Sequence, residues 1–165
     1  MGLLPENELS ELAGVELDRV TGGPVVDESL GTSVPGVFAC GNVLHVHDLV
    51  DFVSEEAARA GKNAAAFVKG EIPQGGPEIR LTGKNGVRYT VPQSIRYAAM
   101  PEEVTVRFRV GEPFYGRYLS CYVDGERIAH RKKQIMAPGE MEQFTIRRSQ
   151  LGPETKEIVF CVEEE

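Results

Sequence analysis

From residue 77 to the end of the chain, apolar and polar residues alternate in short runs that are separated by Gly, Pro, Asn and Asp. Alternation with a period of two is typical of strands that bury one face. Asp124-Gly125 lies between two such runs and predicts a two-residue hairpin turn. The pattern predicts seven strands: Glu78 to Thr82, Val87 to Val91, Val104 to Val110, Arg117 to Val123, Glu126 to Ile135, Glu142 to Arg147 and Glu157 to Glu163.

About seven short strands in roughly 90 residues favour an antiparallel sandwich of immunoglobulin or fibronectin type. The sequence has no Trp, and its three cysteines form no Cys-Trp-Cys pattern. The prediction therefore concerns the architecture only.

The pattern changes in the N-terminal region. Pro35-Gly36 suits the centre of a tight turn, Val37 to Cys40 is an apolar run of the length of a buried strand, and Gly41-Asn42 follows it. An amphipathic helix is expected from about Leu49 to Lys69. Because ligands of open α/β sheets bind beyond the carboxyl ends of strands, we expect a ligand at Gly41-Asn42.

Shorter elements are predicted upstream. Leu3 to Leu12 contains Pro followed by acidic residues, which favours a short helix. Val15 to Asp18 and Pro24 to Asp27 are predicted as short strands. Asp48 or Asp51 is expected to cap the long helix.

The segment from Gly70 to Gly76 is rich in Gly and Pro and predicts a domain boundary. We expect residues 1–70 to belong to an α/β domain, residues 71–76 to form a linker, and residues 77–165 to form the sandwich. By content the fold class is α+β.

The net charge of −7 is concentrated in the first half of the chain. Residues 1–72 hold 12 acidic against 4 basic residues, and residues 73–165 hold 13 against 14. This distribution argues against nucleic-acid binding, which needs basic clusters. No apolar run approaches the roughly 20 residues of a membrane span, and no export signal is visible, so we expect no membrane partner and a cytoplasmic protein.

Cys40, Cys121 and Cys161 are far apart in the sequence and lie in apolar runs. They are interpreted as buried thiols. Since no two of them are close in the sequence, a dithiol redox centre is not predicted.

Residues 1 to about 70 resemble the closing segment of the FAD-binding domain in the pyridine nucleotide-disulfide oxidoreductase family, which has two dinucleotide-binding domains. The resemblance covers somewhat under half of the chain. It rests on four pieces: Gly2-Leu3-Leu4-Pro5-Glu6-Asn7, Gly23-Pro24-Val25-Val26-Asp27, Thr32 to Asn42, and Ser54 to Gly61.

The resemblance implies FAD as cofactor and NAD(P) as second substrate of the parent protein. It assigns cofactor binding to Gly41, Asn42 and Val43, and to the amides of Val53 and Ser54 at the start of the helix. The family usually has Asp where this chain has Asn42, so a charge-assisted bond to the ribityl chain becomes a neutral one. It also implies close helix packing at the glycine of the helix, which is Gly61.

The GxGxxG motif that binds the pyrophosphate in such domains occurs nowhere in the sequence. We therefore expect this chain to be the C-terminal part of a larger FAD-dependent, NAD(P)-linked oxidoreductase, with no catalytic residues, no activity and no retained FAD of its own. Expected partners are the rest of the parent flavoprotein or a partner subunit, and a second copy in a homodimer. The alternative is a non-catalytic β-sandwich module for subunit or partner contact.

His45 and His47, with the neighbouring Asp48, could ligate zinc or another divalent ion. A closed zinc site needs a fourth ligand, and no Cys/His partner motif is visible, so no metal ligand is assigned. Two other roles for these histidines stay open, which are hydrogen bonding within the loop and proton transfer beside a flavin.

The sequence also predicts a basic group. It consists of His130 to Lys133 and Arg147-Arg148, which lie on two strands expected to be neighbours. It could meet an acidic partner. Solvated strand faces and protection of a sheet edge are the favoured interpretation.

Overall fold

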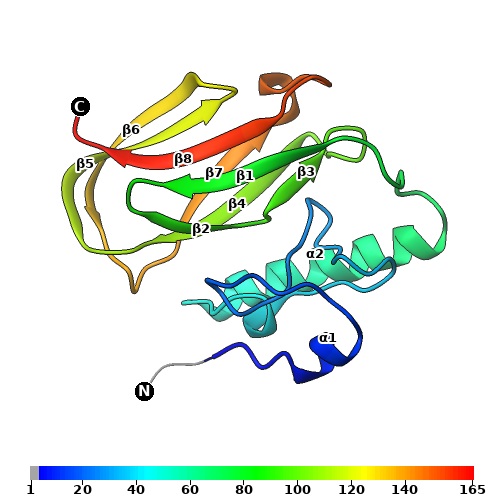
Figure 1. The fold of residues 1–165 in the computed structure, drawn as a ribbon. Helices are drawn as coiled ribbons and strands as arrows, with labels where there is room; N and C mark the ends of the chain where they lie inside the picture. Colours follow the sequence, from blue (N-terminus) through cyan, green and yellow to red (C-terminus); the bar gives the residue numbers. More distant parts are fainter. Residues whose placement is uncertain (1–3) are drawn as a thin grey trace. The chain divides into compact units, whose positions relative to one another are not determined.

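The structure is a computed structural model that describes residues 4–165, and the chain divides into two compact units, residues 1–75 and 76–165. The division falls within the Gly/Pro segment that is expected to be a linker. Helix and strand content is mixed, and most of the regular structure is strand in two sheets (Figure 1). The helical elements are α1 (Glu8–Leu12), η1 (Gly41–Val43), α2 (Val50–Val68) and η2 (Arg148–Gln150).

The seven predicted strands of the second unit are confirmed, with ends that shift by a few residues, and β3 is an additional short strand. Its presence reflects pairing with β1, which a run of three residues does not reveal in the sequence. The strands are β1 (Glu78–Lys84), β2 (Val87–Val91), β3 (Ser94–Arg96), β4 (Glu103–Val110), β5 (Phe114–Val123), β6 (Glu126–Met136), β7 (Glu142–Arg147) and β8 (Glu157–Glu163).

One sheet has the order β3-β1-β8-β5-β6 and the other the order β2-β4-β7. Strands β1 and β8 are parallel, so the prediction of a purely antiparallel sandwich is wrong at this pair. A parallel pair needs a long connection, and here nearly the whole unit connects its first strand to its last. The immunoglobulin or fibronectin assignment stays a prediction.

The core of the second unit lies between the two sheets. The Phe160 ring on β8 lies 5.4 Å from the Phe108 ring on β4 and 5.5 Å from the Phe144 ring on β7, measured between centroids. All three side chains are buried. The alternating pattern of these strands therefore places their apolar residues in a shared core.

The predicted hairpin turn is confirmed. Val123 and Glu126 are paired at the end of β5 and β6. Asp124 and Gly125 have φ values of 47° and 87°. Positive φ at both central residues is what a tight hairpin turn requires, and Asp and Gly tolerate it best.

The first unit has loops where strands are predicted. Among residues 4–75 the structure has only isolated bridges, Leu17 to Pro24, Val26 to Thr32 and Gly31 to Phe38. The strand predictions for 15–18, 24–27 and 37–40 are therefore wrong. Each of these bridges is isolated, so no ladder of paired residues extends along any of the three segments.

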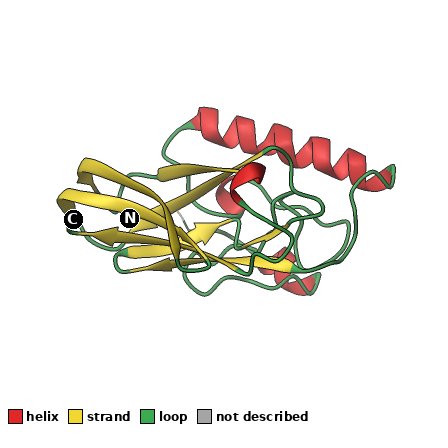
Figure 2. Cartoon of the chain, turned by 90° about the horizontal axis from the view of Figure 1, so that it is seen from above, coloured by secondary structure: helices red, strands yellow, loops and turns green. Residues whose placement is uncertain are grey.

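These loops contact α2, the long helix seen in Figure 2. At the predicted Pro35-Gly36 turn, the Val37 amide donates to the carbonyl of Val34 at 3.1 Å, and Gly36 has a φ of 84°. A Cβ on Gly36 would lie 3.1 Å from Cε1 of the Phe67 side chain. A glycine is therefore favoured both by the turn and by its contact with the helix.

The long helix is confirmed within one residue at each end. Its N-cap is Leu49, and no side-chain hydrogen bond caps it, so the predicted Asp cap is wrong. Asp51 lies in the first turn, where its charge is favourable to the helix dipole. For the short helix the structure gives Glu8–Leu12, and Leu3, its expected beginning, lies outside the described residues.

None of the helices within residues 4–165 combines the length and the apolar character that crossing a bilayer requires.

Candidate functional site

The predicted ligand site Gly41-Asn42, which we call the glycine step, lies directly against α2. Gly41 has a φ of 71°, and a Cβ there would lie 3.4 Å from Cγ1 of Val53. The structure thus brings two of the predicted site residues together, Gly41 and Val53. The amide of Gly41 donates to Oε1 of Glu56 at 2.7 Å, so it is used within the chain.

Asn42 and Val43 complete the η1 turn. The Asn42 side chain is exposed, and its Oδ1 accepts a hydrogen bond from the amide of His47 at 3.2 Å. The carbonyl of Val43 accepts a hydrogen bond from Nδ2 of Asn7 at 2.8 Å. An amide oxygen has two lone pairs, so Oδ1 of Asn42 keeps the capacity to accept a second donor.

Val53 and Ser54 are the fourth and fifth residues of α2. In an α-helix the amides at these positions donate to carbonyls four residues earlier. The amides that helix geometry leaves outside this ladder are those of the first turn, residues 50–52. If the helix start faces a cofactor, the assignment therefore moves one turn toward the N-terminus.

A buried cluster of two imidazoles and a carboxylate lies behind the glycine step. Nε2 of His45 lies 3.1 Å from Oε2 of Glu56, and Nε2 of His47 lies 3.0 Å from Oε1. All three side chains are about 1% exposed. We call these three residues the His45/His47/Glu56 cluster. Two segments form it, the loop after η1 and the second turn of α2.

Burial raises the pKa of Glu56, but hydrogen bonds from His45 and His47, the His45 charge and the Gly41 amide together lower it well below its usual range. Burying a carboxylate costs several kcal/mol, and each hydrogen bond to a charged group contributes about 1.5–3 kcal/mol. Three donors therefore suffice to keep Glu56 ionised inside the first unit.

Nδ1 of His47 is buried and has no hydrogen-bond partner among residues 4–165. A proton on Nδ1 would be a buried N–H without an acceptor, which is costly. The geometry thus favours the tautomer of His47 whose proton is on Nε2 and is donated to Glu56. A neutral imidazole is also the form that binds a metal ion.

Of the three cysteines, Cys121 and Cys161 are buried as predicted, whereas Cys40 is partly exposed. Burial is the main cause that raises the pKa of Cys121 to about 12 and that of Cys161 to about 11. Burial and the nearby Glu56 charge also raise the pKa of Cys40. None of the three is activated as a nucleophile, because a nucleophilic cysteine needs a lowered pKa.

The basic group of the second unit is divided between the edges of two sheets, because β6 and β7 are not neighbours. The expectation of adjacent strands is wrong. Arg131 stacks on the Phe144 ring, Lys133 pairs with Glu142 at 2.6 Å, and Arg147 pairs with Glu103 at 3.1 Å. Each of these three charges therefore has a partner within the chain, and two of the contacts join β6 to β7.

Ser120, His130 and Glu163 also meet on the five-stranded sheet. Oγ of Ser120 lies 2.7 Å from Nδ1 of His130 and donates to Oε2 of Glu163 at 2.5 Å. Hydrogen bonds from Ser120 and Tyr122 are the main cause that lowers the pKa of Glu163. Ser120 is fully buried. A fully buried hydroxyl cannot reach a substrate. In a catalytic triad the serine bonds to the histidine and the histidine bonds to the acid, whereas here Ser120 donates directly to Glu163.

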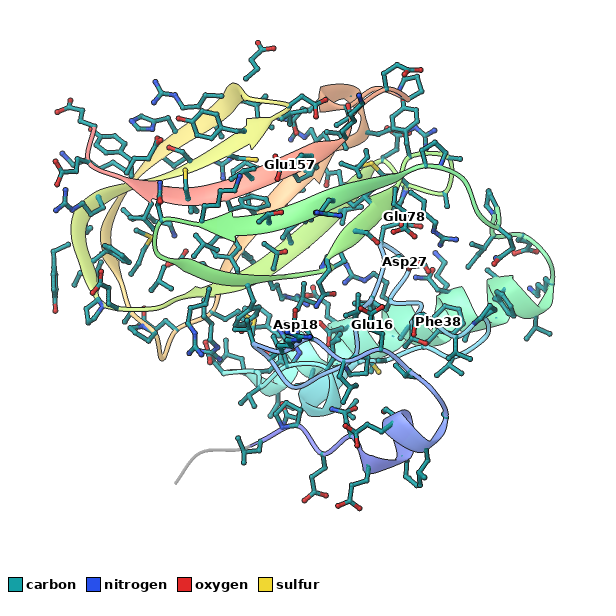
Figure 3. All side chains as sticks on the ribbon, in the orientation of Figure 1. Glu16, Asp18, Asp27, Phe38, Glu78 and Glu157 are labelled. Carbon is teal, nitrogen blue, oxygen red and sulfur yellow. The ribbon has the colours of Figure 1, made fainter. Side chains whose placement is uncertain are left out.

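Figure 3 shows Phe38 projecting from the loop region of the first unit. Its ring makes an edge contact with Phe67 of α2, with centroids 6.0 Å apart. Asn63, one turn earlier on the helix, donates to the carbonyl of Ser29 at 2.7 Å. Together these contacts fix the loop before η1 on the helix, and the Gly41 and Glu56 contact fixes the loop after it.

Two residues of this site are not identified by the sequence reasoning. Glu56 is hidden in the amphipathic helix, where a carboxylate is normally on the solvated face. Asn7 bridges the carbonyls of Gly22 and Val43 from 15 and 36 positions away. The signal for Glu56 is its helical spacing, because it lies four residues before buried Ala60.

Comparisons of the chain with protein-family models, with curated proteins and with solved structures find no match.

Proposed function

We propose that this chain is the C-terminal part of an FAD-dependent, NAD(P)-linked oxidoreductase and that residues 1–75 close its FAD-binding domain. The proposal starts from the resemblance to the pyridine nucleotide-disulfide oxidoreductase family and extends it with one structural observation. That observation is an exposed apolar stripe on α2.

The stripe consists of residues that lie on one side of the helix and are all exposed: Val50, Ser54, Ala57, Gly61, Ala65 and Val68. The side of α2 next to the stripe contacts the loops of the first unit through Val53, Glu56 and Phe67. An amphipathic surface helix normally buries one apolar face and exposes charged or polar residues elsewhere, so an exposed apolar stripe beside the buried face indicates a second packing partner.

Other apolar side chains of the first unit are exposed as well. Within residues 4–165 the large hydrophobic side chains with the greatest exposure are Val68, Leu4, Leu12 and Leu9, at 82–85%. All four belong to the first unit. The unit therefore has more apolar surface than its own loops cover, which supports a role as part of a larger domain.

We infer that the remaining part of the FAD domain covers the α2 stripe. Small residues along a helix allow close approach of a sheet or another helix. Gly61 is consistent with this role, because a Cβ there meets no atom within 4 Å and thus has no function in packing inside the unit.

The residues of the glycine step fit a cofactor contact in part. Gly41 has no side chain, and the amide of exposed Asn42 can face a ribityl hydroxyl. The Gly41 amide is held by Glu56 and is not available to a phosphate. FAD, when bound, would supply the hydride-transfer chemistry, and this chain would supply positioning.

The first test is the coding sequence upstream of Met1, read for an in-frame GxGxxG. Co-expression of that segment with this chain should give a complex that retains flavin. Ala57→Arg places a long charged side chain in the stripe and should abolish the complex. Lys62→Ala, outside the stripe, should leave it intact. A complex that tolerates Ala57→Arg would overturn the role of the stripe.

The second candidate is a non-catalytic module for subunit or partner contact, formed by residues 76–165. It is favoured by the complete core between the two sheets of this unit. Such a core lets a domain fold without a partner and present its surface for binding. Expression of residues 76–165 alone should give a folded protein if this candidate is right. An unfolded product would exclude an autonomous module.

A further inference from the structure

We propose that the His45/His47/Glu56 cluster is a binding site for one divalent ion of the zinc class. Each of the three residues offers one ligand atom, a ring nitrogen or a carboxylate oxygen, and these three atoms all lie within 4.8 Å of one another. The three side chains are buried, so water competes little for these atoms.

The ligand types select the ion. Two imidazoles and one carboxylate are a ligand set that Zn²⁺ uses in proteins. Mg²⁺ and Ca²⁺ prefer oxygen ligands, which disfavours them at a site with two imidazoles. The carboxylate also supplies negative charge against the positive charge of the ion.

The distances suit a small ion. Zinc bonds of about 2.0–2.1 Å put neighbouring ligand atoms of a tetrahedron roughly 3.3 Å apart. The Nε2 to Oε distances are 3.1 Å for His45 and 3.0 Å for His47. Each imidazole faces a different oxygen of Glu56, so an ion between them can contact both rings and the carboxylate after small shifts of the side chains.

The surroundings hold the ligands in place. The Gly41 amide donates to Oε1 of Glu56 at 2.7 Å and fixes the carboxylate. Hydrogen bonds of this kind to a ligating carboxylate orient it toward the metal. The His45 and His47 rings meet edge to face, with centroids 4.4 Å apart. Both rings are therefore positioned before an ion binds.

Two features set the expected strength. Three protein ligands leave one tetrahedral position for water or an external ligand. Metal binding at Nε2 of His47 moves the ring proton to Nδ1, which has no partner among residues 4–165. Both features weaken binding relative to a closed structural zinc site. We expect an exchangeable ion that a chelator removes without unfolding the chain.

The experiment uses the full chain after treatment with a chelator. Titration with Co²⁺ should give the visible absorption of tetrahedral cobalt and saturate at one ion per chain, and Zn²⁺ should displace it. His45→Gln, His47→Gln and Glu56→Gln should each weaken binding at least tenfold. His130→Gln removes the third histidine of the chain, on β6, and should change nothing.

A second measurement covers variants that fail to fold. In the unmodified chain, Co²⁺ should broaden the imidazole NMR signals of His45 and His47 and leave those of His130 sharp. No stoichiometric binding, or broadening at His130 instead, would overturn the proposal. The titration needs no flavin, so its failure would leave the proposed function standing, and failure of the flavin test would leave the metal site standing.

Discussion

The two units of this chain reach a folded structure by different means. The second unit buries apolar side chains from two sheets in one core, with Phe160 at its centre. The first unit has little regular structure besides α2, and polar side chains connect its loops. Asn7 and Glu56 each make contacts to segments far away in the sequence.

The two units therefore respond differently to single substitutions. An apolar core distributes its free energy over many contacts, so a single surface change costs it little. A loop region held by a few buried polar groups depends on each of them, since a lost partner leaves a buried donor or acceptor unpaired. The stability of the first unit, which contains Gly41-Asn42 and the His45/His47/Glu56 cluster, is therefore expected to depend on a few polar residues.

The largest effect is expected for Phe160→Ala in the second unit. Phe160 is fully buried, and its loss creates a cavity between the sheets, which should lower the free energy of unfolding by about 4 kcal/mol. Urea denaturation measures it. Tyr115→Ala, a change at a side chain that is 70% exposed in the same unit, should cost less than about 0.5 kcal/mol.

Glu56→Ala should have the next largest effect, at about 3 kcal/mol in metal-free protein. The substitution leaves the Gly41 amide and two imidazoles without their acceptor. Hydrogen exchange of α2 amides reports it, with strands of the second unit as internal reference. Lys62→Ala changes an exposed residue of the same helix and should have little effect. Equal effects of the two substitutions would contradict the role of the cluster.

Asn7→Ala should cost about 2 kcal/mol in the first unit. The buried Asn7 side chain loses two hydrogen bonds together, to the carbonyls of Gly22 and Val43. Limited proteolysis should then cleave the loops before α2 much faster while β1 to β8 stay intact. Glu8→Ala, at the exposed adjacent position, serves as control. Unchanged proteolysis of Asn7→Ala would show that the loops are held by other contacts.

The smallest expected effect is an increase in the free energy of unfolding. Gly61→Ala should stabilise the isolated chain by up to about 1 kcal/mol, because Ala has the higher helix propensity and its Cβ meets no atom within 4 Å. The shift in hydrogen exchange of α2 measures it. In the complex with the rest of the FAD domain, the same substitution should weaken assembly. A loss of stability in the isolated chain would place Gly61 in an internal contact instead.

The sequence predicts the second unit better than the first for a physical reason. Alternation reports which face of a strand is buried, and it located seven strands and the Asp124-Gly125 turn. It does not report which strands pair, so the parallel β1 and β8 pair and the separation of β6 from β7 were missed.

In the first unit, the sequence predicts correctly the features that depend on local backbone preferences. It does not predict the features that depend on pairing between distant segments. The Pro35-Gly36 turn and the long helix follow from local backbone preferences, and both are present. The predicted strand before Gly41 needs neighbouring strands, and it has one bridge only among the described residues. Glu56 was missed because its partners, His45 and His47, come from another segment.

Flavin retention shows whether residues 1–75 complete an FAD-binding domain. The chain is mixed with excess FAD, alone and together with the segment that carries the GxGxxG motif, and flavin absorbance is read after desalting. We expect no flavin on the chain alone and one FAD per assembled complex, with weaker retention for Asn42→Ala. Retention by the chain alone, or none by the complex, would contradict this expectation.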